Sequence, residues 1–219
     1  MKRGLIVTGG STDKEFGQNY IKENAFDLMI AADSGMHFFY ETGYYPDRII
    51  GDFDSVHEKT LRYFQAQEGI EWVRLIPEKD DTDTEAAIRL AIAAGCDEIH
   101  ILGGTGSRID HMLGNIGLLG IGLTEHVSMF LVDPQNRVRM IRENLLLSKR
   151  EQYGDFVSLL AVTSEVTGVT LTGMKYPLKD DTMHRYSSLG ISNEIVEDVA
   201  EIRLENGVLL VIESLEKPC

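Results

Sequence analysis

Cysteine is scarce in this chain of 219 residues, which contains only Cys96 and Cys219. The two lie far apart and do not show the spacing of a zinc site, so neither a structural metal site nor a disulfide framework is indicated. A chain that does not depend on disulfides suits a reducing compartment, and we expect a cytoplasmic protein.

Long hydrophobic runs are also lacking. The apolar stretch that follows the basic residues at the N-terminus is too short for a signal peptide. The longest later run, Ile116–Leu123, is interrupted by three glycines and is far shorter than a bilayer requires. The sequence therefore predicts no membrane role.

Basic residues are few: 21 Lys and Arg stand against 35 Asp and Glu, which gives a formal net charge of −14. Binding to a nucleic-acid backbone needs a stripe of Lys and Arg, so this balance argues against nucleic acid as a partner. An anionic nucleotide remains compatible if metal ions and a few placed cations reverse the local field. The 43% hydrophobic content is sufficient for a packed core.

Short apolar segments alternate with helical patterns up to about residue 133. Several of these segments, such as Ile99–Leu102, are continuous and of strand length. Such runs are typical of strands buried on both faces, as in a parallel sheet covered by helices. We expect strands at Gly4–Thr8, Asp27–Ala32, Arg48–Ile50, Trp72–Ile76, Glu98–Leu102 and Val127–Val132.

Helical patterns lie between the strands, at Met36–Thr42, Glu58–Gln67 and Glu85–Ala94. The last of these begins after Thr82 or Thr84, either of which can cap it. This alternation predicts an α/β fold: an open, mostly parallel, Rossmann-like sheet with helices on both faces. Ligands of such sheets bind outside the carboxyl ends of the strands.

The pattern changes after Pro134, where β-branched segments are separated by Gly, Asn and Asp. Asn206-Gly207 is typical of a tight turn in a β-hairpin. We expect an α/β domain at residues 1–133 and an all-β domain at residues 134–219. Its predicted strands are Arg137–Arg142, Asn144–Ser148, Asp155–Ala161, Val166–Thr172, Val199–Leu204 and Val208–Glu213.

Five polar clusters follow predicted strands of the first domain. Because the carboxyl ends of parallel strands meet at one edge of a sheet, the five are expected around a single crevice. They are Thr8–Gly10, Ala32–Gly35, Gly51–Ser55, Lys79–Glu85 and Gly103–His111.

Asp52 and Asp54 are two residues apart, and in an extended segment both carboxylates point to the same side. Carboxylate oxygens are ligands that Mg²⁺ prefers, together with water and substrate phosphates. A single Asp here would read as a turn or a helix cap. With the second acidic cluster of Asp80, Asp81 and Asp83 nearby in the expected fold, a magnesium site is favoured.

The segment Gly103–His111 predicts a phosphate cradle, because its glycines let backbone N–H groups approach phosphate oxygens. Arg108 adds a fork of donors. An ordinary glycine-rich turn with Asp110 as a helix N-cap is compatible with the same residues. The segment has neither the Lys-Ser/Thr of a Walker loop nor a dinucleotide fingerprint. His111 could act as a base or as a donor to phosphate, but a lone histidine near the start of a helix is as often structural. His37 is read as part of the buried face of a helix and not as part of a cofactor site.

Taken together, these motifs resemble the thiamin pyrophosphokinase family over nearly the whole chain. The order and spacing of the motifs carry the resemblance more than any one of them. In the first domain they are Ala31–Gly35, Pro46–Ser55, Asp80–Asp83 and Gly103–His111; in the second they are Gly173–Leu178 and Gly190–Glu194.

The resemblance implies transfer of the pyrophosphoryl group of ATP to the hydroxyl of thiamin, in a homodimer with thiamin bound between subunits. It implies a C-terminal β-sandwich for the second domain. The residues that it assigns are Asp52, Asp54 and Asp83 to Mg²⁺, Gly103, Gly104, Thr105, Gly106, Ser107 and Arg108 to ATP, Asp33 and Asp110 to the reacting end, and Tyr176, Ser192 and Asn193 to thiamin.

Tyr176 suits the cationic thiazolium of thiamin, because an aromatic face attracts a cation. The family often has Leu where Met174 stands, and some members have Trp in place of Tyr176. Two alternatives stay open at this point: a pyrophosphokinase for another alcohol such as a pterin, and a non-catalytic sensor of nucleotide or thiamin.

Overall fold

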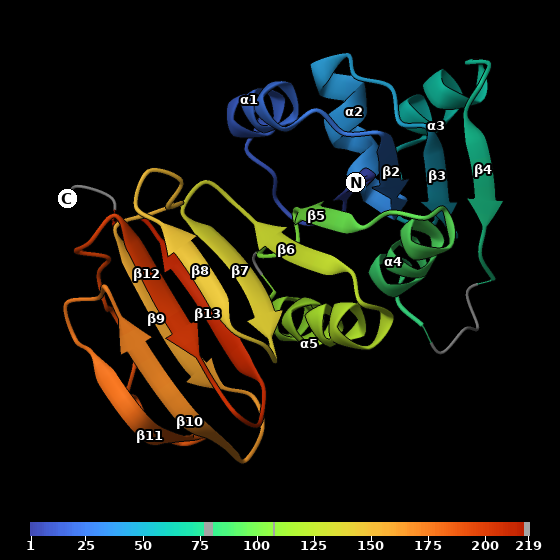
Figure 1. Cartoon of the computed structure of the whole chain (residues 1–219). Coiled ribbons are helices and arrows are strands. Elements are labelled where there is room, and N and C mark those ends of the chain that lie inside the picture. The colour runs from blue at the N-terminus through green and yellow to red at the C-terminus, as the bar shows by residue number, and fades with distance from the viewer. Residues whose placement is uncertain (77–80, 107, 217–219) are drawn as a thin grey trace. The chain divides into compact units, whose positions relative to one another are not determined.

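The computed structural model describes residues 1–76, 81–106 and 108–216. Lys79 and Asp80 of the second acidic cluster, Ser107 of the glycine-rich segment and Cys219 lie outside the described residues. The chain divides into two compact units, residues 1–134 and residues 135–219. Figure 1 shows helices in the first unit and strands alone in the second.

The first unit has a sheet of six parallel strands in the order β4-β3-β2-β1-β5-β6. The chain first builds outward from β1 to β4 and then returns to place β5 on the other side of β1. The order therefore reverses between β1 and β5, where open α/β sheets bind their ligands. The strands are β1 (Arg3–Val7), β2 (Leu28–Ala32), β3 (Arg48–Gly51), β4 (Glu71–Arg74), β5 (Glu98–Leu102) and β6 (Ser128–Val132).

Helices cover both faces of this sheet, as Figure 1 shows. On one face α2 contacts both α1 and α3, and on the other α4 packs on β1, β2 and β3 beside α5. The sequence-based fold class is therefore confirmed. The helices are α1 (Lys14–Asn24), α2 (Met36–Thr42), α3 (Glu58–Gln65), α4 (Asp83–Ala93) and α5 (Ile109–Glu125), and a short 3-10 turn, Asp33–Gly35, precedes α2.

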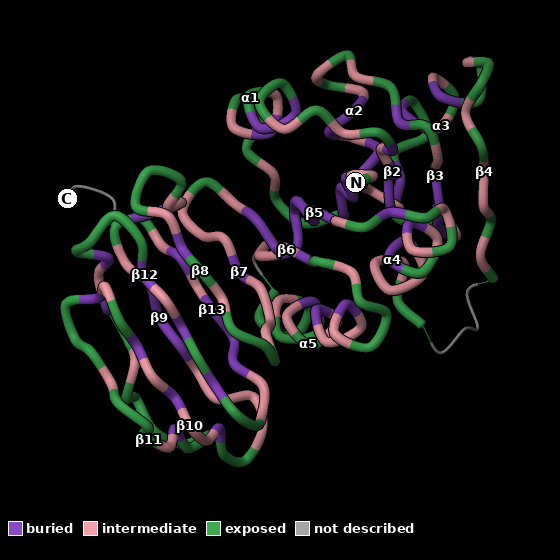
Figure 2. Tube along the Cα trace, viewed as in Figure 1, coloured by how far each residue is buried: buried purple, intermediate pink, exposed green. Residues whose placement is uncertain are grey.

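The apolar runs of the central strands are buried on both faces of the sheet. Leu5, Ile6 and Ile30 are fully buried, and so are Ile99 and Ile101 of β5 (Figure 2). Consecutive buried residues point to opposite faces, so each strand contributes to the core under both helical layers. No helix among the described residues has the length and apolar character needed to cross a membrane.

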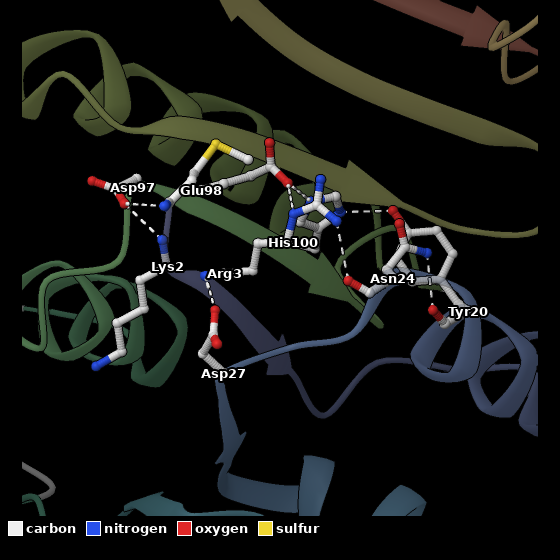
Figure 3. Close-up of polar contacts among 9 residues, drawn as sticks. Lys2, Arg3, Tyr20, Asn24, Asp27, Asp97, Glu98 and His100 are labelled. Carbon is white, nitrogen blue, oxygen red and sulfur yellow. Dashed lines mark hydrogen bonds and ion pairs between the residues drawn. The ribbon is translucent and has the colours of Figure 1, made fainter.

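A polar network fixes α1 to β5, away from the carboxyl ends of the strands (Figure 3). The Tyr20 hydroxyl lies 2.6 Å from His100 Nδ1, and His100 Nε2 lies 3.0 Å from the Glu98 carboxylate. A carboxylate only accepts, so Nε2 carries a proton and donates it to Glu98. The hydrogen bond from His100, with help from Arg3, lowers the pKa of Glu98. The network therefore joins α1 to β5 through side chains that do not line the cavity described below.

The second unit is an antiparallel β-sandwich. In one layer β13 (Leu209–Ser214) pairs with β7 (Asn136–Ile141) and β9 (Phe156–Ala161). The other has the order β11-β10-β12-β8. Val157 and Leu159 of the first layer share a buried core with Val169 and Ile202 of the second. The strands of the second layer are β8 (Leu145–Ser148), β10 (Glu165–Thr172), β11 (Leu178–His184) and β12 (Val199–Arg203).

The predicted hairpin at Asn206-Gly207 is wrong, because β12 and β13 belong to different layers and do not pair with each other. Gly207 does adopt a positive φ of 103°, but Asn206 does not, so the two-residue type I′ turn is not formed. Instead Thr167 of β10 donates its N–H to the Asn206 carbonyl at 3.0 Å. The turn carries the chain from one layer to the other.

Candidate active site

A cavity of about 370 Å³ lies at the carboxyl ends of the parallel strands. Its lining comes from segments that follow β1, β2, β3 and β5 and from the first turns of α4 and α5. All five sequence-predicted clusters contribute to this lining, through Thr8, Asp33, Ser55, Asp83 and Gly104. The expectation of a single crevice is thereby confirmed.

The carboxylates of Asp33, Asp52 and Asp54 form one cluster, with an oxygen from each within 4.8 Å of the others. The backbone around them adopts unusual conformations: φ is 48° at Asp33 and 68° at Phe53. Residues other than glycine rarely adopt such a positive φ, which costs on the order of 1–3 kcal/mol per residue. Two of the six described non-glycine residues with positive φ, Asp33 and Phe53, therefore lie where the three carboxylates are brought together.

The extended geometry expected for Asp52–Asp54 is wrong. Phe53 is left-handed, and the Asp54 N–H bonds back to Asp52 Oδ1 at 3.1 Å, which makes a tight turn. The Phe53 ring is held edge-on against Trp72 of β4, with ring centroids 5.3 Å apart. The two carboxylates are therefore brought together by a turn instead of by the alternation of a strand.

The cluster has the electrostatics of a cation site. The nearby Asp52 carboxylate is the main cause that raises the pKa of Asp54 above its ordinary value. The Ser55 hydroxyl donates to Asp33 Oδ2, while Asp33 Oδ1 is buried and has no hydrogen-bond partner among the described residues. A hard divalent cation would supply the missing partner and relieve the repulsion, so the donor set fits Mg²⁺.

Asp83 is the first residue of α4, whose N-cap is Thr82. The Thr82 hydroxyl accepts the N–H of Glu85 at 3.2 Å, which decides between the two predicted caps. Asp83 lines the cavity, and its charge contributes to the raised pKa of Asp54. Among the described residues the compact cluster nevertheless contains Asp33 and not Asp83.

The glycine-rich segment after β5 lies directly against the segment after β1. A Cβ built on Gly10 would approach the Gly103 carbonyl oxygen to 1.9 Å, so only glycine fits at this position. Gly103 itself has a φ of 76°. Gly103, Gly104, Gly106 and Arg108 line the cavity.

Asn115 on α5 fixes this segment, because its buried side chain donates to the Gly104 carbonyl at 2.9 Å. The sequence analysis did not single out Asn115. A signal was present, since Asn115 and His111 are four residues apart and so share one face of a helix. Both residues line the cavity.

Arg108 and Asp110 bind each other at the start of α5. Arg108 donates from Nη2 to Asp110 Oδ2 at 2.6 Å and from Nε to Oδ1 at 3.2 Å. This pair, followed by the N–H of His111, lowers the pKa of Asp110 to about 2. The N-cap of α5 is Arg108, so the prediction that Asp110 caps the helix is wrong.

The candidate residues of the second unit gather around Asn193, whose exposed fraction is 2%. Its Oδ1 accepts the N–H of Tyr176 and of Glu194, both at 2.9 Å, and its Nδ2 donates to the Tyr176 carbonyl at 2.8 Å. Tyr176 is 57% exposed. Asn193 therefore holds the backbone that presents the Tyr176 ring.

Ser192 has a φ of 55°, and its N–H bonds to the hydroxyl of Ser158 at 3.0 Å. Ser158 is a residue that the sequence analysis missed, because a serine in the middle of a strand carries no signal of its own. Lys175, which precedes Tyr176, pairs with Glu194 at 2.5 Å. The segments 175–176 and 192–194 are thus joined by both side chains and backbone.

An open α/β sheet with carboxylates and glycine-rich turns at its switch point, followed in sequence by a β-sandwich, makes this chain a protein of two units whose cavity suits a divalent cation and a phosphate-bearing ligand. A family model described as "Thiamin pyrophosphokinase, catalytic domain" matches residues 19–131, and one described as "Thiamin pyrophosphokinase, vitamin B1 binding domain" matches residues 143–209. The chain belongs to the thiamin pyrophosphokinase family.

Individual relatives agree with the family assignment. The chain is 32% identical over 189 residues to a thiamine pyrophosphokinase of Bacillus subtilis, which covers 86% of this chain and 88% of the relative. The crystal structure of thiamine pyrophosphokinase from Bacillus subtilis superposes with a TM-score of 0.89 at 30% identity, over 99% of this chain and 100% of that one. A thiamin pyrophosphokinase structure from Geobacillus thermodenitrificans gives 0.85 at 29% identity, over 99% of each chain.

Proposed function

We propose that this chain transfers the pyrophosphoryl group of ATP to the hydroxyl of thiamin, releasing AMP and thiamin diphosphate. The observation that carries the proposal is the convergence of a strained carboxylate cluster and a glycine-rich segment on one cavity, in a chain of this family. Transfers of this kind depend on positioning and on neutralising charge more than on covalent help from the protein.

In this proposal Asp52 and Asp54, with Asp33 or Asp83, hold Mg²⁺, which when bound neutralises phosphate charge. Gly103, Gly104, Thr105, Gly106, Ser107 and Arg108 are assigned to ATP. Arg108 is paired with Asp110 and would exchange that partner for a phosphate, a favourable exchange for a planar fork of donors. Asp33 and Asp110 are placed near the reacting end.

Tyr176, Ser192 and Asn193 are proposed to bind thiamin. The exposed Tyr176 ring offers a face to the thiazolium cation. Asn193 fixes the position of the Tyr176 backbone, which carries that ring, through two hydrogen bonds. The match of residues 143–209 to the vitamin B1 binding domain supports this assignment.

The decisive assay measures AMP by chromatography after incubation with ATP, Mg²⁺ and thiamin. Formation of AMP and thiamin diphosphate in equal amounts is expected, and omission of thiamin should stop AMP release. Release of ADP, or of AMP independently of thiamin, would contradict the proposal. Replacing Mg²⁺ by chelator should abolish turnover if the carboxylates act through a metal.

We also propose a homodimer with thiamin bound between subunits, as the family resemblance implies. The test mixes two impaired variants, Asp54→Asn and Asn193→Ala, after partial unfolding and refolding together, and measures turnover at a thiamin concentration too low for either variant alone to turn over appreciably. Shared sites would recover part of the turnover, because a mixed dimer holds one site with neither substitution. No recovery, in a mixture that sedimentation shows to be dimeric, would rule out the shared site.

A further inference from the structure

The turn that carries Asp52 and Asp54 is connected to its surroundings at three points. The Phe53 ring contacts Trp72, and the Ser55 hydroxyl donates to Asp33. The third contact is at the far end of the turn, where the backbone N–H of His57 points at His37 Nε2 at 3.4 Å. This last contact involves two histidines to which the proposed function gives no role.

His37 lies between the two segments that form the carboxylate cluster, namely the segment of Asp33 and the turn of Asp52 and Asp54. It stands in the first turn of α2, which begins directly after the Asp33–Gly35 turn. His57 is the N-cap of α3 and lies two residues after Ser55, the last residue of the segment that holds Asp52 and Asp54. A bond between His37 and His57 therefore connects the Asp33 segment to the end of the Asp52–Asp54 turn.

The hydrogen bonds of His37 define its tautomer. A backbone N–H can only donate, so Nε2 must be the unprotonated acceptor and the ring proton must be on Nδ1. Nδ1 then donates to the hydroxyl of Thr60, which lies 2.9 Å away on α3 and is buried. Burial, and next the neighbouring His57, lower the pKa of His37, while Glu41 and Asp33 act in the opposite direction. A neutral ring is consistent with both bonds.

His37 also substitutes for a missing helix cap. The side chain of His57 makes no capping hydrogen bond at the start of α3. First-turn N–H groups of a helix need partners from outside it. His37 supplies one partner to the backbone at residue 57 and a second contact to Thr60 in the same first turn.

From these contacts we propose that His37, neutral and protonated on Nδ1, is a positioning residue that holds the turn of Asp52 and Asp54 in register with Asp33. The inference rests on the proposed metal-binding role of that cluster. His37 acts through the backbone of His57 and does not itself touch the cation.

The alternative is that His37 only packs, since its ring centroid lies 4.8 Å from that of His57. Three substitutions separate the two. His37→Gln places an amide oxygen near the former Nε2 and keeps an acceptor for the His57 N–H. His37→Asn reaches only to the former Nδ1 and keeps a partner for Thr60 alone. His37→Phe keeps the ring and loses both hydrogen bonds.

The measurement is Mn²⁺ binding to the full chain by calorimetry, with ATP present and thiamin absent. We expect His37→Asn and His37→Phe to bind Mn²⁺ about tenfold more weakly, the effect typical of a residue that orients a metal ligand. His37→Gln should stay within about twofold of the unsubstituted chain. Equal affinities in all three variants, or equal losses in all three, would overturn the proposal.

Two control variants make the binding measurement specific. Cys96→Ala alters a buried side chain next to Gly4 of β1, far from the cluster in sequence and outside the cavity, and should leave Mn²⁺ binding unchanged. Asp52→Asn should lose Mn²⁺ binding. If it does and His37→Asn does not, the inference about His37 alone fails; if Asp52→Asn binds normally, the proposed metal site itself fails and the inference with it.

The tautomer of His37 can be measured independently through its ring nitrogens. At neutral pH and without metal, long-range ¹H–¹⁵N NMR should show a protonated Nδ1 and an unprotonated Nε2. A proton on Nε2 would overturn the proposal, whatever the binding data show.

Discussion

The two units hold their candidate residues in opposite ways. In the first, the carboxylates of Asp33, Asp52 and Asp54 repel one another, and a buried oxygen of Asp33 has no hydrogen-bond partner among the described residues. In the second, Asn193 is buried with both ends of its amide hydrogen-bonded. The first arrangement leaves a buried polar atom without a partner among the described residues, whereas the hydrogen bonds of the second are complete within the chain.

Substitutions of the carboxylates in the first unit should therefore lower activity without lowering stability. Substitution of Asn193 in the second unit should lower both. Removing a crowded carboxylate relieves repulsion in the folded state while it removes a ligand for the cation. Removing Asn193 leaves backbone groups without partners, so folding and substrate binding should both suffer. Each substitution below tests this contrast.

Asp54→Asn should have the largest effect. A charged metal ligand contributes several kcal/mol to transition-state stabilisation, so turnover should fall by about a thousandfold. The urea unfolding midpoint without metal should stay the same or rise. The pKa of Asp54 is raised in the fold, mainly by Asp52, so ionisation opposes folding and stability falls as pH rises through that pKa.

The matched comparison is therefore made without metal at two pH values. The variant should gain on the unsubstituted chain above the ordinary pKa of a carboxyl group and lose that gain in more acidic solution. A variant that is both inactive and less stable at neutral pH would break the contrast between the two units.

Asn193→Ala should destabilise the chain by about 3 kcal/mol, since three hydrogen bonds of about 1 kcal/mol each are lost. The KM for thiamin should rise roughly tenfold or more because the Tyr176 backbone is no longer fixed, while the KM for ATP should not change. Asn144→Ala is the control, because Asn144 accepts a single bond from Leu204 in the same unit. A change in the KM for ATP alone would contradict the assignment of Asn193 to thiamin.

Much of the sheet could be predicted from sequence, because a strand buried on both faces must be apolar throughout. Glu98–Leu102 was predicted with its observed bounds, and the other five parallel strands are displaced by no more than two residues at either end. Helix α1 was missed because few of its residues, among them Tyr20 and Ile21, are buried. Strand β11 was missed because Asp180 and Asp181 are exposed, so its apolar alternation is weak.

The site was predictable in its parts but not in its geometry. Placing polar clusters after strands was enough to bring Asp33, Asp52 and Gly104 to one cavity. The left-handed turn at Phe53 was not predictable, because it depends on Trp72, nineteen residues away in sequence. The burial of Asn193 likewise follows from its pairing with Val157 of β9. Long-range contacts of this kind leave no local pattern.

A smaller effect is expected from a pair of glycine substitutions in the first unit. Gly10→Ala would force a Cβ to within 1.9 Å of the Gly103 carbonyl oxygen and should cost about 2 kcal/mol together with turnover. Gly114→Ala, where a Cβ meets nothing within 4 Å, should stabilise α5 by up to about 1 kcal/mol. Thermal unfolding measures both. Equal effects would show that the close approach of the two segments does not control the site.

The smallest effect is expected at Asp110, a candidate carboxylate of the first unit that is already paired with an arginine, Arg108. Its folded pKa is lowered to about 2, so the stability that it contributes is present above the ordinary carboxyl pKa of about 4 and is lost as pH falls through about 2. Both side chains are largely exposed, so the contribution is small and salt should screen it further.

Asp110→Asn should therefore lower the urea midpoint slightly at neutral pH and low salt, with the difference fading toward pH 2. Glu58→Gln is the matched control, because Glu58 pairs with Arg62 on an equally exposed helix surface outside the cavity. If Asp110 lies at the reacting end, its substitution lowers turnover and that of Glu58 does not. Equal turnover in both variants would leave Asp110 as the partner of Arg108 alone and confine the acidic chemistry to the cluster of Asp33, Asp52 and Asp54.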